Sequence, residues 1–182
     1  MTTAASIPSH SHSHAIVDLA YCDLHRELKF TRKVLERLPE EKFGWKPHEK
    51  SMALGRLAMY VATIPEWMLM TIRHDVLDMS DPPKMKIEPE NHADLIKTFD
   101  TNADAVTEAF ARLVDHELEK TWSMKQGGQV IYSATKNHVL RVWCLNHLIN
   151  HRGQICLYLR LLNLPVPAVY FNSADEPDWV LE

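Results

Sequence analysis

The sequence predicts an all-α fold, a four-helix bundle with one small β-hairpin before the last long helix. Three observations carry this prediction. Four long segments repeat apolar residues at steps of three and four, which is typical of one face of an amphipathic helix. Between the third and fourth segments, a short stretch around two adjacent glycines alternates apolar and polar residues, as a hairpin does. No linker divides the chain, so we expect a single domain over residues 15–182.

The first helix is expected from Ala15 to about Leu38, because apolar residues recur on one face until Pro39 ends the pattern. Residues 1–14 before it are small, polar and without periodicity, so we expect a disordered tail. This tail is rich in histidine and serine, a composition that chelates metal loosely. After the helix, Glu40–Lys50 contains glycine and proline and is expected to form a loop.

The second helix is expected from Met52 to about His74, with Ser51 as its N-cap. Pro65 lies in the middle of this segment and removes one backbone donor. We therefore expect a kink or a short break close to it. A loop is expected to follow at residues 78–89, where three prolines interrupt any regular pattern.

The remaining elements follow from the same signals. A third helix is expected after Asn91, whose side chain suits an N-cap. The β-hairpin is expected at Thr121–Tyr132, and the fourth and longest helix from about Thr135 to Leu162. Pro165 and Pro167 then force an extended tail.

Composition excludes several classes of protein. The 182 residues are 46% hydrophobic with a net charge of −4, and no basic stripe of the kind that binds nucleic acid is visible. No apolar run approaches the ~18 residues of a membrane span. The N-terminus lacks the pattern of a secretory signal, so we expect a cytoplasmic protein. Cys144 and Cys156 would lie about 18 Å apart on one helix, too far for a disulfide, and we expect reduced thiols.

The fourth helix carries the strongest candidate for chemistry. His147 and His151 are one helical turn apart, a spacing that lets two imidazoles converge on one cation. Apolar residues flank both, so burial is expected, and a buried imidazole needs a metal or hydrogen-bond partners. Asn146 and Asn150 are candidate hydrogen-bond partners. A purely structural role for the two histidines therefore remains an alternative to metal binding. Cys144 lies about 10 Å along the helix from His151, so a third ligand is expected from a neighbouring helix.

Two segments resemble a known family. Asn146–Glu176 and Phe43–Trp67 are similar to the signature motifs of the DinB/YfiT-like superfamily of metalloenzymes. The resemblance implies a four-helix bundle of DinB/YfiT type with a metal held by three histidines, one from the second helix and two from the last. His147 and His151 match the last-helix pair. At the position that the resemblance assigns to the second-helix histidine, this sequence has Tyr60.

Three roles for Tyr60 follow from this departure. As a phenolate ligand, it would need a pKa drawn well below ~10. As a neutral phenol with a catalytic role, it would donate a hydrogen bond to a metal-bound water or to an imidazole. As a filler, it would replace a ligand in a site that no longer binds metal.

Two functions therefore stay open. The resemblance implies a divalent metal, zinc or nickel, at the mouth of the bundle, with activity as a thiol-dependent transferase or a metal-dependent hydrolase. The alternative is a non-catalytic dimeric bundle or small-molecule binder that lost the metal because Tyr60 replaces the usual histidine. A homodimer is the expectation that the resemblance carries, with neither nucleic acid nor membrane as a partner. No residue specifies the substrate.

Two further expectations concern other charged residues. Arg152 and Arg160 of the fourth helix are expected to pair with acidic groups of the C-terminal tail, Asp175 or Glu176. The histidines outside the pair are expected at helix ends or on polar faces, exposed to solvent.

Overall fold

A computed structural model describes residues 13–178, so the tail histidines at positions 10 and 12 lie outside the described residues. The elements, in order, are α1 (Ala15–Ala20), α2 (Leu24–Leu35), η1 (Glu40–Lys42), α3 (Leu54–Arg73), β1 (Val76–Asp78), α4 (His92–Ala111), α5 (Asp115–Glu119), β2 (Thr121–Gln126), β3 (Gln129–Thr135), α6 (Lys136–His138), η2 (Val139–Leu145) and α7 (Asn146–Leu161). The mostly helical fold that the sequence predicts is confirmed.

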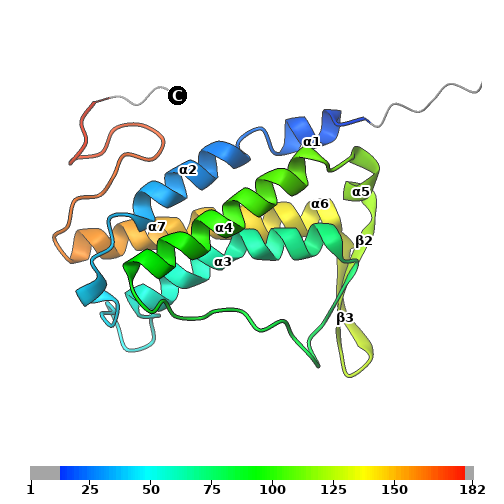
Figure 1. The fold of residues 1–182 in the computed structure, drawn as a ribbon, viewed down its shortest axis with the longest axis horizontal. Coiled ribbons are helices and arrows are strands. Elements are labelled where there is room, and N and C mark those ends of the chain that lie inside the picture. Colours follow the sequence, from blue (N-terminus) through cyan, green and yellow to red (C-terminus); the bar gives the residue numbers. More distant parts are fainter. Residues whose placement is uncertain (1–12, 179–182) are drawn as a thin grey trace, which may run out of the picture.

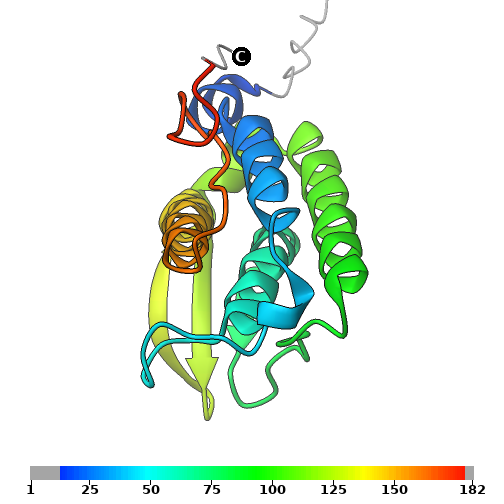
Figure 2. The same cartoon turned by 90° about the vertical axis from the view of Figure 1, so that its left-hand side faces the viewer.

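The long helices α2, α3 and α4 and the run from α6 to α7 lie side by side around one core (Figure 1 and, end-on, Figure 2). Each contributes a fully buried large side chain, such as Leu35, Leu57, Phe99 and Leu148. The strands form a small sheet in the order β1-β2-β3 beyond one end of these helices. Within the described residues, no helix is long and apolar enough to cross a membrane.

The helix predicted from Ala15 to Leu38 is divided into α1 and α2, so the prediction of one continuous helix is wrong. Tertiary contacts at the junction explain the break. The buried Tyr21 donates its hydroxyl proton to the side-chain oxygen of Asn137, at 2.8 Å, which ties the junction to α6. Asp23 forms an ion pair with Arg141 of η2. The apolar periodicity continues across the junction, but these tertiary contacts end α1 and start α2 as a separate helix.

The start of α3 is capped differently from the prediction. The helix begins at Leu54 without a side-chain cap, so Ser51 is not its N-cap. The N–H of Leu54 instead donates to the carbonyl of Trp45 at 2.8 Å, and the N–H of Gly55 donates to the carbonyl of Phe43 at 2.9 Å. Backbone carbonyls of the preceding loop therefore satisfy the exposed donors of the first turn.

Gly55 is required where this loop packs on α3. A Cβ at Gly55 would lie 2.8 Å from the Cβ of Phe43. We expect Gly55→Ala to lower the free energy of unfolding by about 1–3 kcal/mol, because the loop must shift. At Gly153, an exposed position in α7, an added Cβ meets nothing within 4 Å, so Gly153→Ala should stabilise by about 0.5–1 kcal/mol. Urea unfolding measures both changes, and a Gly55→Ala variant as stable as the native chain would contradict this packing.

Pro65 does not interrupt α3, which runs continuously from Leu54 to Arg73. The predicted break is therefore absent. The side-chain amide of Asn102, on the neighbouring α4, donates to the carbonyl of Ala62 at 3.1 Å. This bond adds a donor in the turn beside the proline, where a backbone N–H is missing.

The hairpin lies where the sequence predicts it, and its turn uses Gly127 and Gly128 with φ of 57° and 79°. Positive φ at both central residues matches the twist of a two-residue hairpin and favours glycine. The third strand, β1, falls just before the predicted loop and was missed. The strand β1 pairs in parallel with β2 and is only 3 residues long.

The last predicted helix is confirmed as a helical run, but it is not α-helical throughout. Residues Val139–Leu145 form a π-helical segment, η2, and the α-helix α7 begins directly after it. Thr135 caps the start of the run by accepting a hydrogen bond from the N–H of His138. Single π turns inside α-helices are frequent next to functional sites. Here the π-helical segment ends two residues before His147.

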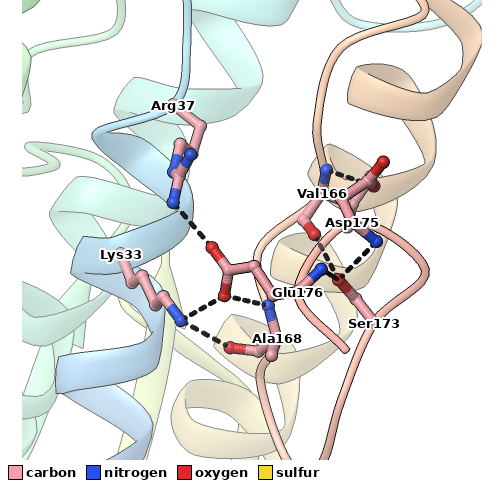
Figure 3. A network of polar contacts seen from close by, with 7 residues as sticks. All are labelled: Lys33, Arg37, Val166, Ala168, Ser173, Asp175 and Glu176. Atoms are coloured by element: carbon pink, nitrogen blue, oxygen red, sulfur yellow. Dashed lines mark hydrogen bonds and ion pairs between the residues drawn. The ribbon is translucent and has the colours of Figure 1, made fainter. Parts of the chain in front are cut away.

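The C-terminal tail is held by ion pairs, only some of which were predicted. Arg160 binds Asp175, as expected. Glu176, however, contacts Lys33 of α2 and Arg37 just after this helix, both at 2.6 Å (Figure 3). The predicted pairing of Arg152 with the tail carboxylates is wrong, because Arg152 pairs with Glu27 of α2 at 2.7 Å.

Candidate functional site

The two candidate histidines converge at the start of α7. The Nε2 atoms of His147 and His151 lie 2.8 Å apart, and the ring centroids are 4.5 Å apart. His151 is buried, with 9% of its surface exposed, and His147 is partly buried. The convergence that the one-turn spacing predicts is therefore present.

The other ring nitrogens set the direction of both imidazoles. Nδ1 of His151 lies 2.9 Å from the side-chain oxygen of Gln154, and Nδ1 of His147 lies 3.3 Å from the carbonyl of Trp143. A carbonyl oxygen only accepts, so each imidazole donates its Nδ1–H there. Both Nε2 atoms then turn lone pairs toward each other, an arrangement that a shared proton or a cation stabilises. The expected partners Asn146 and Asn150 are exposed and make neither contact.

Burial lowers the pKa of His151 below its usual 6.5, and the neighbouring His147 adds to this effect, although Gln154 opposes it. At mildly acidic pH the unfolded chain therefore binds a proton more readily than the fold does. The stability that neutral His151 contributes is present above pH 6.5 and is lost as the pH falls through its lowered pKa.

We expect the free energy of unfolding of the native chain to fall more steeply between about pH 7 and pH 5 than that of His151→Gln. Urea unfolding at a series of pH values measures the slope. His25→Gln, at an exposed position of α2, is the matched control and should keep the native slope. A His151→Gln variant with the native slope would exclude this titration as a source of acid sensitivity.

Tyr60 reaches the pair from α3. Its ring centroid lies 5.5 Å from that of His147 and 5.2 Å from that of His151, with both rings nearly edge-on to it. Burial raises the pKa of the Tyr60 hydroxyl, and nearby Cys144 adds to the rise. A raised pKa keeps the phenol neutral at pH 7 and disfavours its use as an anionic ligand.

A third ligand of the usual kind is missing from the neighbourhood. Within residues 13–178, no three histidine, cysteine, aspartate or glutamate side chains are grouped so that they would hold a metal ion. Cys144 is buried next to Thr71, and burial raises its pKa to about 12, so it is a protonated thiol. All three cysteines are free, as the sequence predicts. The donor set therefore fits two positions of a three-histidine metal site and leaves the third unfilled.

The remaining histidines differ in how well they match expectation. His48, in the loop before α3, is exposed and accepts a hydrogen bond from the N–H of Lys50. His92, expected to be solvated, is partly buried, and its Nε2 lies 3.0 Å from the carbonyl of Leu35. That contact joins α4 to the end of α2 and was not visible in the periodicity of either helix.

A cavity of about 540 Å³ is lined in part by Tyr60. One wall is the face of α3 that carries Arg56, Tyr60 and Trp67, and the other is the loop at residues 82–87, which runs beneath α3 in Figure 1. The sequence alone does not mark this loop as part of a site. Its run of prolines, lysines and apolar residues looks like a linker until the fold places it against α3.

Comparison with known proteins identifies the class. The DinB family model matches residues 12–179, and the chain therefore belongs to the DinB family. A DinB-like protein from Bacillus cereus ATCC 10987 has a similar structure, with a TM-score of 0.65 at 22% identity over 83% of this chain and 95% of that one. The DinB-like protein YjoA from Bacillus subtilis gives a TM-score of 0.61 at 17% identity over 81% and 95%. No curated protein matches the chain.

Proposed function

We propose that this chain is a four-helix bundle of DinB type that binds a small organic molecule beside a two-histidine site. In this proposal the histidine pair does not hold a divalent metal ion tightly by itself. Tyr60 is the observation that carries it. Its ring faces both imidazoles from α3, the helix from which the family resemblance implies a third histidine.

The chemistry of Tyr60 supports this reading. A neutral phenol is a poor ligand for zinc or nickel, which prefer imidazole and thiolate. In the described part of the chain, the Tyr60 hydroxyl has no hydrogen-bond partner, and Tyr60 also lines the adjacent cavity. A polar group without a protein partner at the wall of a cavity is suited to orient a bound molecule.

A metal-dependent hydrolase or thiol-dependent transferase is the second candidate. It is favoured by the two convergent Nε2 lone pairs, which match the arrangement of metal-ligating histidines. In that case His147 and His151 would hold zinc or nickel, and the ion would supply a Lewis acid at neutral pH. The unfilled third position is the reason for ranking this candidate second.

Metal analysis by inductively coupled plasma mass spectrometry separates the two candidates. The chain is purified without nickel affinity and measured before and after dialysis against zinc. His10→Ser and His12→Ser in the full chain remove two of the three tail histidines, and the Nδ1 of the third, His14, lies 2.8 Å from the carbonyl of Leu113. We expect clearly substoichiometric metal. One ion per chain that disappears in His147→Ala would overturn the proposal in favour of the metalloenzyme.

We further propose that the protein forms a homodimer in the cytoplasm, without nucleic acid or membrane partners. Exposed apolar residues on η2 and α7, namely Val142, Leu157 and Leu161, support a helical dimer face. Light scattering coupled to gel filtration would measure the mass. A monomer at all concentrations tested would contradict the dimer.

A further inference from the structure

The cavity beside Tyr60 is lined by charged and apolar side chains from two segments. Arg56, Tyr60, Thr63 and Trp67 recur at steps of three and four and so share one face of α3. The opposite wall belongs to residues 82–87, which contribute prolines, lysines and apolar side chains. At about 540 Å³ the cavity falls within the roughly 300–1,000 Å³ typical of small-molecule sites.

The charges that line the cavity are unbalanced. Three cationic side chains line it, Arg56, Lys84 and Lys86, and none of the described lining residues is acidic. Lys86 is compensated by Asp94, at 2.6 Å, and by Glu90. Arg56 and Lys84 form no ion pair anywhere in residues 13–178. Arg56 and Lys84 are exposed and line the cavity without a protein counter-charge.

The rest of the lining is largely apolar. Trp67 lies on the α3 side, and Pro83, Met85 and Ile87 lie on the loop side. A smaller cavity of about 280 Å³ shares Trp67 and Pro83 with the first and extends toward β1. Aromatic and aliphatic walls of this kind favour an apolar ligand body, because its burial removes hydrocarbon from water.

We propose that this cavity binds a small organic anion, a carboxylate with an aromatic or aliphatic body. The carboxylate binds Arg56 and Lys84, and the apolar body packs between Trp67 and the residue 82–87 loop. Tyr60 lies about 6 Å along the helix axis from Arg56, so its hydroxyl is placed to contact polar atoms adjoining the carboxylate. This assignment names the ligand class and rests on the proposed function.

Arg56 is the residue expected to dominate recognition. A guanidinium presents two parallel donors to a carboxylate, whereas a lysine offers a single point charge. A neutral amide of the same shape leaves this cation without a counter-charge. The cavity should therefore discriminate between a carboxylate and its amide, and a purely apolar groove would not.

The test uses the full-length protein in buffer containing a chelator, with isothermal titration calorimetry as the readout. The probes are 4-phenylbutyrate, its neutral amide 4-phenylbutanamide, and octanoate. We expect saturable binding of at least one carboxylate. The amide should bind at least roughly tenfold more weakly than 4-phenylbutyrate. Arg56→Gln should weaken binding of the carboxylate about tenfold and leave binding of the amide nearly unchanged. Arg26→Gln, at an exposed position of α2, removes the same charge elsewhere and should have no effect.

Three outcomes would overturn the assignment. These are no saturation by either carboxylate up to about 10 mM, equal binding of amide and acid, or equal effects of Arg56→Gln and Arg26→Gln. Repeating the titration with zinc separates this inference from the proposed function. Carboxylate binding that requires zinc and is lost in His147→Ala would refute both. Metal-free binding that depends on Arg56, together with stoichiometric zinc at the histidines, would refute only the proposed function.

Discussion

Replacing Glu27 by alanine is expected to lower the free energy of unfolding by about 3–5 kcal/mol, because it leaves the buried guanidinium of Arg152 without a counter-charge. The side chains of Glu27 and Arg152 are 2% and 3% exposed, and their charged atoms are 2.7 Å apart. Arg152 also donates to the carbonyl of Glu27 and to the hydroxyl of Tyr170, which in turn donates to the Glu27 carboxylate at 3.1 Å. Without Glu27, the arginine keeps its charge and loses its counter-charge. Urea unfolding measures the loss.

Two further variants show whether burial causes this effect. Glu176 also pairs with two cations, but its side chain is 25% exposed, so Glu176→Ala should cost less than about 1 kcal/mol from its ion pairs. The double variant Glu27→Met, Arg152→Met removes both buried charges and should recover most of the stability that Glu27→Ala loses. If Glu176→Ala and Glu27→Ala were equally destabilising, the special role of the buried pair would be refuted.

The second large effect is expected at Leu148, between the two histidines. Leu148 is fully buried, whereas Leu19 of α1 is 81% exposed and lies outside the proposed dimer face. We expect Leu148→Ala to lower the free energy of unfolding by about 2–5 kcal/mol, because it removes buried hydrocarbon and leaves a cavity under α7. Leu19→Ala should change the free energy of unfolding by less than about 0.5 kcal/mol.

Thermal and urea unfolding of both leucine variants would measure this difference. Similar losses for the two would show that α7 is not anchored through the face that carries Leu148. The histidine pair depends on this anchoring, because Leu148 fixes the rotation of the helix that presents both imidazoles.

The long helices were predictable because each carries an apolar stripe long enough to reveal its period. The divisions within them were not. Tyr21 and Asp23 break the first helix through contacts with Asn137 and Arg141, which are more than a hundred residues away in sequence. Likewise, the three residues of β1 have no pattern of their own and form a strand only because β2 is beside them. Such features depend on tertiary contacts.

The candidate site was predictable to a similar extent. The one-turn spacing of His147 and His151 gives their convergence directly, since adjacent turns of a helix place side chains on one face. The partner Gln154 and the carbonyl of Trp143 were not foreseen, because the adjacent asparagines were equally plausible donors and acceptors. The contact of Tyr60 with both imidazoles required the relative placement of α3 and α7.

We infer that Tyr60 occupies the position of a third metal ligand. A zinc titration by calorimetry of the native chain and of Tyr60→His, both with His10→Ser and His12→Ser, tests this inference. We expect no tight zinc site in the native chain and one zinc ion per chain in Tyr60→His, bound at least about tenfold more tightly. Equal zinc binding by the two chains, whether tight or absent, would contradict it.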